Sequence, residues 1–511
     1  MSLSILLASC TQSVQEDLLG KSDDRPNIIF IMADDLGYGE LGCYGQEKIE
    51  TPNIDQLRKE GMKFNQFYTA APVCAPARCM LLTGKHSGHA YVRGNDEWGD
   101  RGEVWDYVAM AKDPNLEGQR PMPSAEVTIA EHLKSVGYST GMVGKWGLGA
   151  PLTESIPNKQ GFDFFYGYNC QRQAHTYYPL HLYENESRVY LENDTVAPRQ
   201  KLPIGADPND PDSYAMFNLD EYASTLMFDK MINYVDTIGS DPFFLYWASP
   251  IPHLPLQAPE KWVEHYKEKF GPEEPYTGDR GYFPHQYPRA AYAGMVSYLD
   301  ENIGKLVAKL KAQGKYENTI ILFTSDNGPS YVGGYDLEFF DGAKPFKSER
   351  GRTKGQLNEG GIRVPLIVTW PSKIAAGSST DHQSGFWDVL ATLSQIAGLV
   401  VEEETDGISF LPTLLNQDQK NHEYLYWEFP ESGGQRALRM GDWKLLNKDM
   451  KKGNLTWQLF NLKDDPSEQN DVAIKYPEII EKGVDIWEAN HVPSHLPRWQ
   501  YAALGEEGED N

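Results

Sequence analysis

Cysteine, positive charge and long apolar runs are all scarce in this 511-residue chain. Five cysteines are too few for a disulfide framework. The 47 Lys and Arg residues are outnumbered by 73 Asp and Glu residues, which gives a net charge of -26. Such a balance excludes a general nucleic-acid-binding surface, because a phosphate backbone needs clustered positive charge. No stretch approaches the roughly 20 apolar residues of a membrane span, so the sequence predicts no transmembrane segment.

Short apolar runs are present instead, and each is followed by polar residues. Near-continuous hydrophobic runs of this length are typical of parallel strands that are covered on both faces. Helical patterns lie between the runs, and this alternation predicts an α/β fold with a doubly wound, mainly parallel sheet. The predicted strands are 27–33, 139–143, 243–247 and 319–324, and the predicted helices are 54–60, 128–135, 222–237 and 292–313.

The residues that follow the predicted strands offer the chemistry of a site. Ligands of doubly wound sheets bind beyond the carboxyl ends of the strands, so we expect these residues to lie close together. Asp34, Asp35, Asp326 and Asn327 provide only oxygen ligands, which suit a hard divalent cation, Ca²⁺ better than Mg²⁺. The acidic pair at 34–35 alone would equally suit a helix cap or a solvated turn.

The composition divides the chain into three parts. Residues 26–416 hold the alternating pattern and form the predicted catalytic domain, and 417–511 form a smaller C-terminal subdomain. Within that subdomain, 438–446 and 457–462 predict two strands of an antiparallel sheet, and 477–489 predicts a helix.

Residues 1–25 are predicted to be a leader and tether. Leu7-Ala8-Ser9-Cys10 is similar to a bacterial lipobox, in which the cysteine becomes lipidated after cleavage. The sequence therefore predicts an exported protein, periplasmic or attached to the outer membrane through Cys10. The apolar stretch before Cys10 is short and lacks Lys and Arg, so an ordinary disordered terminus is the alternative.

Cys74-Ala75-Pro76-Ala77-Arg78 is the most informative motif of the chain. Pro76 suits the first turn of a helix, where a missing N–H costs nothing. Cys74 would then lie at a helix N-terminus, which favours negative charge. By themselves, the five residues would equally suit a buried thiol beside a loop proline.

Two further segments, taken together with this motif, resemble a known protein family. Gly144-Lys145-Trp146 ends a predicted strand, and residues 354–365 contain Lys354 followed by Glu-Gly-Gly-Ile-Arg-Val-Pro. Together they resemble the type I sulfatases over residues 26–472. The resemblance implies an alkaline-phosphatase-like fold and hydrolysis of a sulfate ester. It further implies that a formylglycine-generating or anaerobic sulfatase-maturating enzyme oxidises Cys74 to formylglycine, the nucleophile, which also contacts the metal.

The resemblance implies a role for each remaining motif residue. Arg78 would hold the hydrated aldehyde, and Lys145 and Lys354 would bind the sulfate. His253 lies in a loop with three prolines, residues 249–255, and would protonate the departing sugar oxygen. Isolated lysines and loop histidines are usually structural, so these assignments depend on the context.

Position 147 departs from the family pattern. Most relatives have Gly-Lys-Trp-His-Leu-Gly where this chain has Gly144-Lys145-Trp146-Gly147-Leu148-Gly149. The usual histidine helps to release sulfate by taking a proton from formylglycine, which Gly147 cannot do. His175 is a candidate substitute and is equally a candidate sugar ligand.

The segment 171–179 further resembles exported carbohydrate sulfatases of Bacteroidetes-type bacteria, which degrade glycosaminoglycans or other sulfated glycans. Within that group the similarity indicates an exo-acting enzyme on O4 of galactose or N-acetylgalactosamine. Specificity must come from groups that reach the sugar, since sulfate is common to all substrates. Structural salt bridges are the alternative for the two later arginines. The predicted sugar ligands are Gln171, Arg172, His175, Arg352 and Arg436.

Two other functions remain as alternatives. A phosphatase or phosphodiesterase of the alkaline phosphatase superfamily would carry a Ser or Thr nucleophile and a histidine-rich pair of metals. Cys74 and Asn327 argue against it. A non-catalytic glycan-binding protein would explain Gly147, but it would not need Arg78, His253 and the two lysines.

Overall fold

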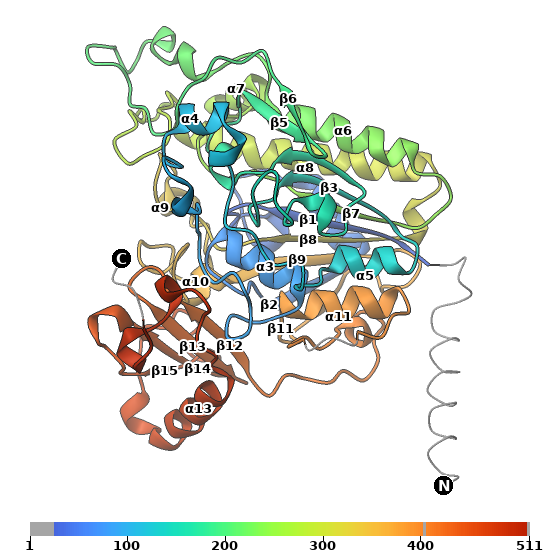
Figure 1. Ribbon diagram of the computed structural model, residues 1–511, viewed down its shortest axis with the longest axis vertical. Helices are drawn as coiled ribbons and strands as arrows, with labels where there is room; N and C mark the ends of the chain where they lie inside the picture. The colour runs from blue at the N-terminus through green and yellow to red at the C-terminus, as the bar shows by residue number, and fades with distance from the viewer. Residues whose placement is uncertain (1–24, 402–404, 508–511) are drawn as a thin grey trace.

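The computed structural model describes residues 25–401 and 405–507, which are built around one large mixed sheet (Figure 1). Within these residues the strand order is β10-β2-β9-β8-β1-β7-β3-β4-β5-β6, and β11 pairs beside β2. The four predicted strands form its centre, β8-β1-β7-β3, and all pairings among them are parallel, as predicted. These central strands are β1 Asn27–Ala33, β3 Ser139–Lys145, β7 Phe243–Ala248 and β8 Thr319–Ser325.

The outer strands were not predicted, because they are short or interrupted. β9 runs antiparallel to both β8 and β2, and it contains Pro365, whose missing N–H weakens a strand signal. β2 has an irregular register between Phe64 and Phe67. The outer strands are β2 Met62–Tyr68, β4 Phe164–Tyr168, β5 His181–Glu184, β6 Ser187–Tyr190, β9 Arg363–Thr369, β10 Ser378–Thr380 and β11 Ser384–Gly385.

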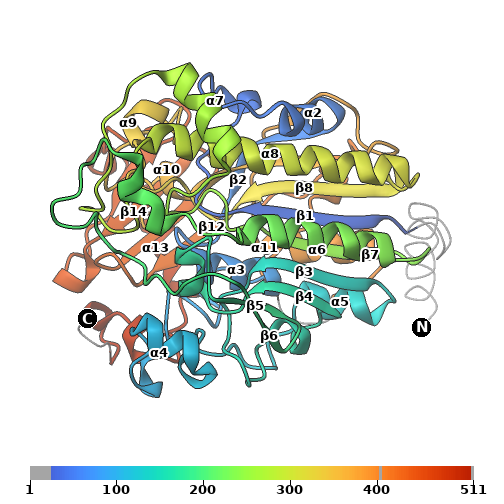
Figure 2. The same ribbon diagram turned by 90° about the horizontal axis from the view of Figure 1, so that it is seen from above.

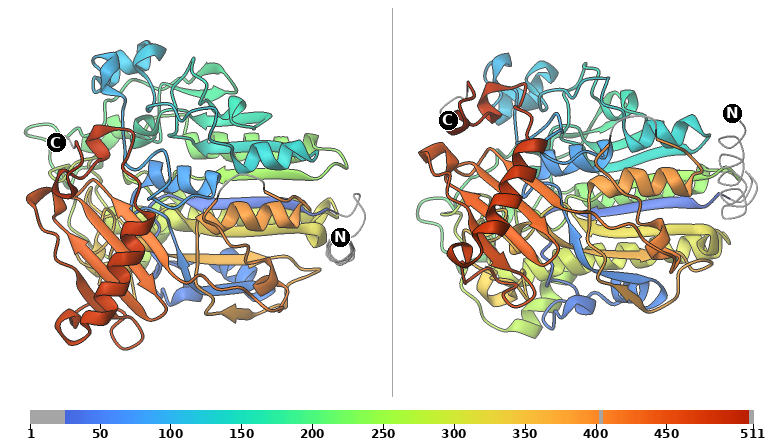
Figure 3. Two further views of the ribbon diagram at one scale, coloured as in Figure 1. Left: turned by 60° about the horizontal axis from the view of Figure 1, so that its bottom comes forward. Right: turned by 90° about the horizontal axis from the view of Figure 1, so that it is seen from below.

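Helices cover both faces of the sheet, which confirms the doubly wound α/β class. Side chains of β1 alternate between two cores: Ile28 and Phe30 pack on the side of α3, α5 and α11, and Ile29 and Ile31 pack on the side of α2, α6 and α8. Figure 3 brings the α11 face forward. The helices of this part are α2 Pro52–Glu60, α3 Cys74–Thr83, α4 Tyr107–Lys112, α5 Ile129–Ser135, α6 Ala223–Thr237, α7 Glu260–Phe270, α8 Pro288–Ala312, α9 Leu337–Phe340, α10 Glu359–Ile362, α11 Trp387–Ile396 and α12 Leu411–Leu414.

The C-terminal part forms a separate antiparallel sheet of the order β12-β13-β14-β15. The prediction of a single strand over 438–446 is wrong. The structure has a hairpin there, in which Gly441 (φ 55°) and Asp442 turn the chain between β13 and β14. Gly-Asp is a turn signal, but the apolar residues on both sides make the segment look like one continuous strand in the sequence. The elements are β12 Leu425–Phe429, β13 Gln435–Met440, β14 Trp443–Lys448, β15 Gln458–Asn461 and α13 Pro477–Asn490.

The carboxyl ends of the parallel strands all face one end of the molecule. Figure 2 shows α4, α9, α10 and the C-terminal sheet gathered at that end, opposite the start of β1. This is the place where ligands of doubly wound sheets bind. Among the described residues, no helix has both the length and the apolar character needed to cross a bilayer. The predicted lipid anchor at Cys10 lies outside the described residues.

Candidate active site

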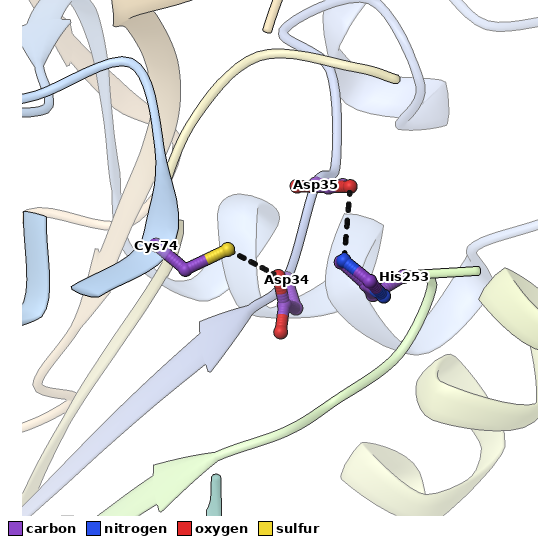
Figure 4. Close-up of side chains that lie close together, drawn as sticks. All are labelled: Asp34, Asp35, Cys74 and His253. Carbon is purple, nitrogen blue, oxygen red and sulfur yellow. Dashed lines mark hydrogen bonds and ion pairs between the residues drawn. The ribbon is translucent and has the colours of Figure 1, made fainter. Parts of the chain in front are cut away.

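The residues predicted from the strand ends do meet in space (Figure 4). Asp34 and Asp35 follow β1, Cys74 begins α3, and His253 lies in the loop after β7. The Cys74 Sγ atom is 3.4 Å from Asp34 Oδ1, and His253 Nε2 is 3.8 Å from Asp35 Oδ2. All four side chains are buried. The sheet therefore places a potential nucleophile, two carboxylates and an imidazole around one point.

The ends of β1 and β8 are tied together by backbone geometry at Asp35. Its φ of 66° is left-handed, a strained conformation for a residue other than glycine. This conformation lets the Asp35 amide donate to Asp326 Oδ1 at 3.0 Å. Asn327 Nδ2 in turn donates to Asp35 Oδ1 at 2.8 Å. The four predicted oxygen ligands thus lie in one buried cluster.

Three buried or partly buried cations balance the three carboxylates of this cluster. Lys145 Nζ is 2.6 Å from Asp34 Oδ2, and Lys354 Nζ is 2.6 Å from Asp35 Oδ1. Arg78 reaches Asp34 at 3.3 Å and Asp326 at 2.9 Å, and it also donates to the Lys145 carbonyl oxygen at 2.6 Å. Paired charges of this kind are how a protein tolerates ionised groups in its interior.

The surroundings shift the pKa values of the acidic groups of the cluster in different directions. Burial alone would raise the pKa of Asp34, but the charges of Lys145 and Arg78 hold it well below its usual range. Burial and the negative charge of Asp34 raise the pKa of Asp326 to about 7. Burial, reinforced by Asp34, also raises the pKa of the Cys74 thiol far above neutrality. Cys74 is therefore not a thiolate nucleophile, because only the deprotonated form attacks.

The cluster also fits a divalent metal ion. Asn327 Oδ1 is buried and has no hydrogen-bond partner among the described residues. Together with the oxygens of Asp34, Asp35 and Asp326, it forms the hard donor set that Ca²⁺ and Mg²⁺ prefer. A cation at this position would satisfy the unpaired oxygen and reduce repulsion between the adjacent carboxylates.

His175 lies against His253 rather than against Gly147. The two rings stack with centroids 5.3 Å apart and planes 6° apart, and Tyr282 contacts both edge-on. His253 Nδ1 is 2.6 Å from the Leu254 carbonyl oxygen, so this nitrogen carries a proton and Nε2 faces the cluster. Burial lowers the pKa of both imidazoles, and the charge of Lys354 adds to this at His253.

Gln171 occupies the space beside Gly147. Gly147 has a φ of 78°, and a Cβ atom built on it would lie 3.0 Å from Gln171 Oε1. Gln171 Nε2 donates to Asn95 Oδ1 at 3.2 Å, and the Ala75 amide donates to the same oxygen at 3.3 Å. Asn95 thus links Gln171 to the first turn of α3.

The structure does not bring Arg352 and Arg436 to the Cys74 cluster. Arg352 pairs with Glu349 at 2.9 Å and donates to carbonyl oxygens of the loop before α13. Arg436 lies within the C-terminal sheet between the rings of Trp457 and Trp487, at 4.2 and 4.7 Å. Arg352 thus forms the salt bridge of the structural alternative, whereas Arg436 has ring and hydrogen-bond contacts but no salt bridge among the described residues. Arg172 lies between Gln171 and His175 in the turn η6 (Gln171–His175), and its guanidinium lies over the ring of Trp105 rather than in the cluster.

Sequence reasoning missed two residues of the site. Asn95 holds the first turn of α3 through Ala75, and Tyr282 holds the His175–His253 stack. Neither residue belongs to a recognisable motif. Only the left-handed φ of 63° at Tyr282, which the structure alone reveals, marks that position as unusual.

Comparisons with known proteins agree with this geometry. The sulfatase family profile matches residues 26–399, and the profile of the C-terminal part of N-sulphoglucosamine sulphohydrolase matches 353–483. The chain is 29% identical to an N-acetylgalactosamine-6-O-sulfatase of Bacteroides thetaiotaomicron, covering 95% of this chain and 96% of the relative. It is 30% identical to the N-acetylgalactosamine-6-sulfatase of Rattus norvegicus, covering 76% and 66%.

A solved structure is similar over nearly the whole chain. The structure of Ps i-CgsB in complex with k-i-k-neocarrahexaose has a TM-score of 0.70 and 28% identity, and covers 92% of this chain and 94% of that one. The similarity confirms the alkaline-phosphatase-like fold with its smaller antiparallel C-terminal sheet. The chain therefore belongs to the sulfatase family and is a sulfuric ester hydrolase.

Proposed function

We propose that this enzyme removes sulfate from a galactose or N-acetylgalactosamine unit of a sulfated glycan. The observation that carries the proposal is the arrangement around Cys74: Lys145 and Lys354 bring two ammonium groups to the cluster, and His253 faces it with a free nitrogen. Two relatives with carbohydrate substrates in their names support a sugar as the alcohol part of the ester.

The sulfatase family implies formylglycine at the position of Cys74 and a divalent metal ion. We propose Ca²⁺ in preference to Mg²⁺, held by the oxygens of Asp34, Asp35, Asp326 and Asn327, because Ca²⁺ accepts protein carboxylate and amide oxygens in flexible geometry, whereas Mg²⁺ usually keeps several waters. When present, formylglycine supplies a hydroxyl nucleophile, and the ion supplies positive charge beside it.

The surrounding residues bind and orient the sulfate. Lys354 Nζ lies 3.8 Å from Cys74 Sγ, so it reaches an ester group placed over residue 74. Lys145 is fully buried and fixed on Asp34, which makes it a preorganised cation. Arg78, one turn further along α3, would act on residue 74 through Asp34, which contacts both side chains.

His253 is the proposed proton donor to the departing sugar oxygen. Its Nδ1 is held by the Leu254 carbonyl oxygen, which directs Nε2 into the cluster. Burial and the charge of Lys354 lower the pKa of His253, which disfavours the charged ring in the ligand-free enzyme. A sulfate ester bound beside the ring would raise that pKa, since a nearby anion favours the charged imidazolium. Substrate binding and protonation of His253 are thereby coupled.

Exo action is part of the proposal and rests on the sequence resemblance. Cys74 is 2% exposed, so the reacting sulfate must enter a recess of the protein to reach it. Sequence resemblance favours sulfate on O4, whereas the relatives named above act on the 6-position. Both esters therefore belong in the assay.

We also propose the maturation and location predicted from the sequence. A formylglycine-generating or anaerobic sulfatase-maturating enzyme would convert Cys74 before or during folding, since the side chain is buried afterwards. Export to the periplasm or outer membrane, with a lipid on Cys10, would place the enzyme where extracellular glycans are degraded.

The deciding experiment is a panel of defined monosulfated saccharides assayed for inorganic sulfate. N-acetylgalactosamine 4-sulfate, N-acetylgalactosamine 6-sulfate and the matching galactose esters identify the sugar and the hydroxyl. A phosphorylated chromogenic ester tests the phosphatase alternative. We expect release from sulfate esters and little from the phosphate ester. Preferential phosphate release would overturn the proposal, and binding without turnover would favour the glycan-binding alternative.

A further inference from the structure

Arg172 is a buried cation without hydrogen-bond partners. Its side chain belongs to the turn η6, and the residue is only 6% exposed. Even so, Nε, Nη1 and Nη2 have no hydrogen-bond partner among the described residues. A buried guanidinium normally donates to carboxylates or carbonyl oxygens, because an unpaired buried charge is costly. Arg78, by comparison, is bonded to two carboxylates and a carbonyl oxygen.

No described residue accepts a hydrogen bond from the Arg172 guanidinium, whose three nitrogens are themselves buried. The guanidinium carbon lies 5.2 Å from the ring centre of Trp105, whose side chain is 66% exposed. Glu97 is a nearby acid, but burial raises its pKa to about 6 against the opposing charge of Arg172, and the two form no ion pair. An exposed indole next to an unpaired guanidinium offers a ring face to a sugar and a planar fork to an anion.

The turn η6 connects this pair to the catalytic cluster. One residue before Arg172, Gln171 fills the space beside Gly147. Three residues after it, His175 stacks on His253. Arg172 therefore belongs to a short turn whose two ends contact Gly147 and His253.

We propose that Arg172 and Trp105 form an anion subsite for a second negatively charged group, sulfate or carboxylate, on the saccharide that is cleaved at Cys74. Trp105 would contact the sugar ring, and Arg172 would bind the anionic oxygens in a bidentate manner. This inference rests on the proposed sulfatase function and specifies its substrate as a glycan with more than one anionic group.

The test compares substrates that share the cleaved ester. Wild-type enzyme and Arg172→Met would be assayed on an N-acetylgalactosamine monosulfate, the 4,6-disulfate, and a glucuronate-containing disaccharide monosulfate. We expect wild type to prefer one of the doubly anionic substrates. Arg172→Met should lower kcat/KM for it by roughly tenfold to a hundredfold, as expected for lost hydrogen bonds to a charged group. The monosulfated monosaccharide should change little.

The two doubly anionic substrates distinguish sulfate from carboxylate as the bound group. Arg172→Lys should recover only part of the preference, because an ammonium lacks the planar fork. Trp105→Ala should lower kcat/KM for the two doubly anionic substrates, because both would lose contact with the indole ring. Since the buried charge has no partner in the free enzyme, Arg172→Met should also unfold at the same or a higher temperature than wild type.

Arg101→Gln is the matched control. Arg101 also lies over an indole, 4.5 Å from the Trp98 ring centre, but it donates to backbone carbonyl oxygens of Asn115 and Glu117. It should leave the preference for doubly anionic substrates unchanged. An equal effect of Arg172→Met on all substrates, or a marked loss of thermal stability, would make Arg172 structural and overturn the inference. Sulfate release without any such preference would refute the subsite while leaving the sulfatase function intact.

Discussion

The enzyme should lose stability between neutral and alkaline pH through one histidine of the C-terminal subdomain. His491 Nδ1 lies 2.7 Å from Glu428 Oε1, and its Nε2 lies 2.5 Å from Glu506 Oε1. Glu428 also binds Arg93 at 3.3 Å, and Arg93 is two residues before Asn95, which holds the first turn of α3. The histidine therefore helps to fix a loop that reaches the active site.

The size of the effect follows from the pKa of His491. Burial alone would lower it, but hydrogen bonds to Glu428 and Glu506 raise it from 6.5 to about 9. A rise of this size corresponds to about 3 kcal/mol, at about 1.4 kcal/mol for each unit. Solvent reaches part of the imidazole, so we expect about 1 to 2 kcal/mol after screening. Because the folded state binds the proton more tightly, this stability is complete below pH 6.5 and is lost as the pH rises through about 9.

The assay is urea unfolding of wild type and His491→Gln at about pH 6 and about pH 9.5. Trp487 stacks on His491 with ring centres 4.6 Å apart, so tryptophan fluorescence reports on this region directly. Wild type should lose about 1 to 2 kcal/mol more than the variant between the two pH values. Equal losses in both proteins, or an NMR titration of His491 near its ordinary pKa, would refute the reasoning.

Three further outcomes concern catalysis. Cys74→Ala should abolish turnover, and peptide mass spectrometry of active wild type should show formylglycine at position 74; full activity of the variant would contradict this assignment. Chelation or Asp326→Ala should abolish sulfate release, and elemental analysis should find calcium, whereas a stoichiometric zinc pair would favour the phosphatase alternative. His175→Ala should lower kcat/KM roughly tenfold or more on sulfated saccharides and little on a small aryl sulfate, because the ring lies beside His253. Equal losses on both substrates would instead indicate that His175 acts as the base that helps to release sulfate, a role that Gly147 cannot fill.

The centre of the fold and the cluster around Cys74 were predictable for the same reason. Buried parallel strands must be apolar along their whole length, so β1, β3, β7 and β8 are visible as runs. Their carboxyl ends face one side of the sheet, so residues that follow them converge even when they are far apart in sequence. Asp34 and Asp326, joined through Arg78, are 292 positions apart and in one cluster.

No comparable rule places the residues of the loops and of the C-terminal subdomain relative to the site. Nothing local to Arg436 indicates that two tryptophans of the C-terminal subdomain enclose it. Arg352 is two residues from Lys354, but its contacts turn it toward Glu349 and the loop before α13. Proximity in sequence to a site residue is weak support for membership of the site, because residues 351–356 form turns and bends, in which spacing along the chain does not fix where a side chain points.

Gly147 shows how the departure from the family pattern is accommodated. A histidine there would require a Cβ at a left-handed φ of 78° and 3.0 Å from Gln171 Oε1, so the chain cannot regain it by a single substitution without displacing Gln171. Gln171 Oε1 is buried and has no partner among the described residues. Nε2 of the same side chain donates to Asn95 Oδ1, which also accepts from the Ala75 amide. A neutral amide can accept or donate a hydrogen bond there, but it cannot take up a proton near neutral pH. The imidazole that the family pattern places at 147 is absent here, and the Gln171 amide occupies the space beside that position.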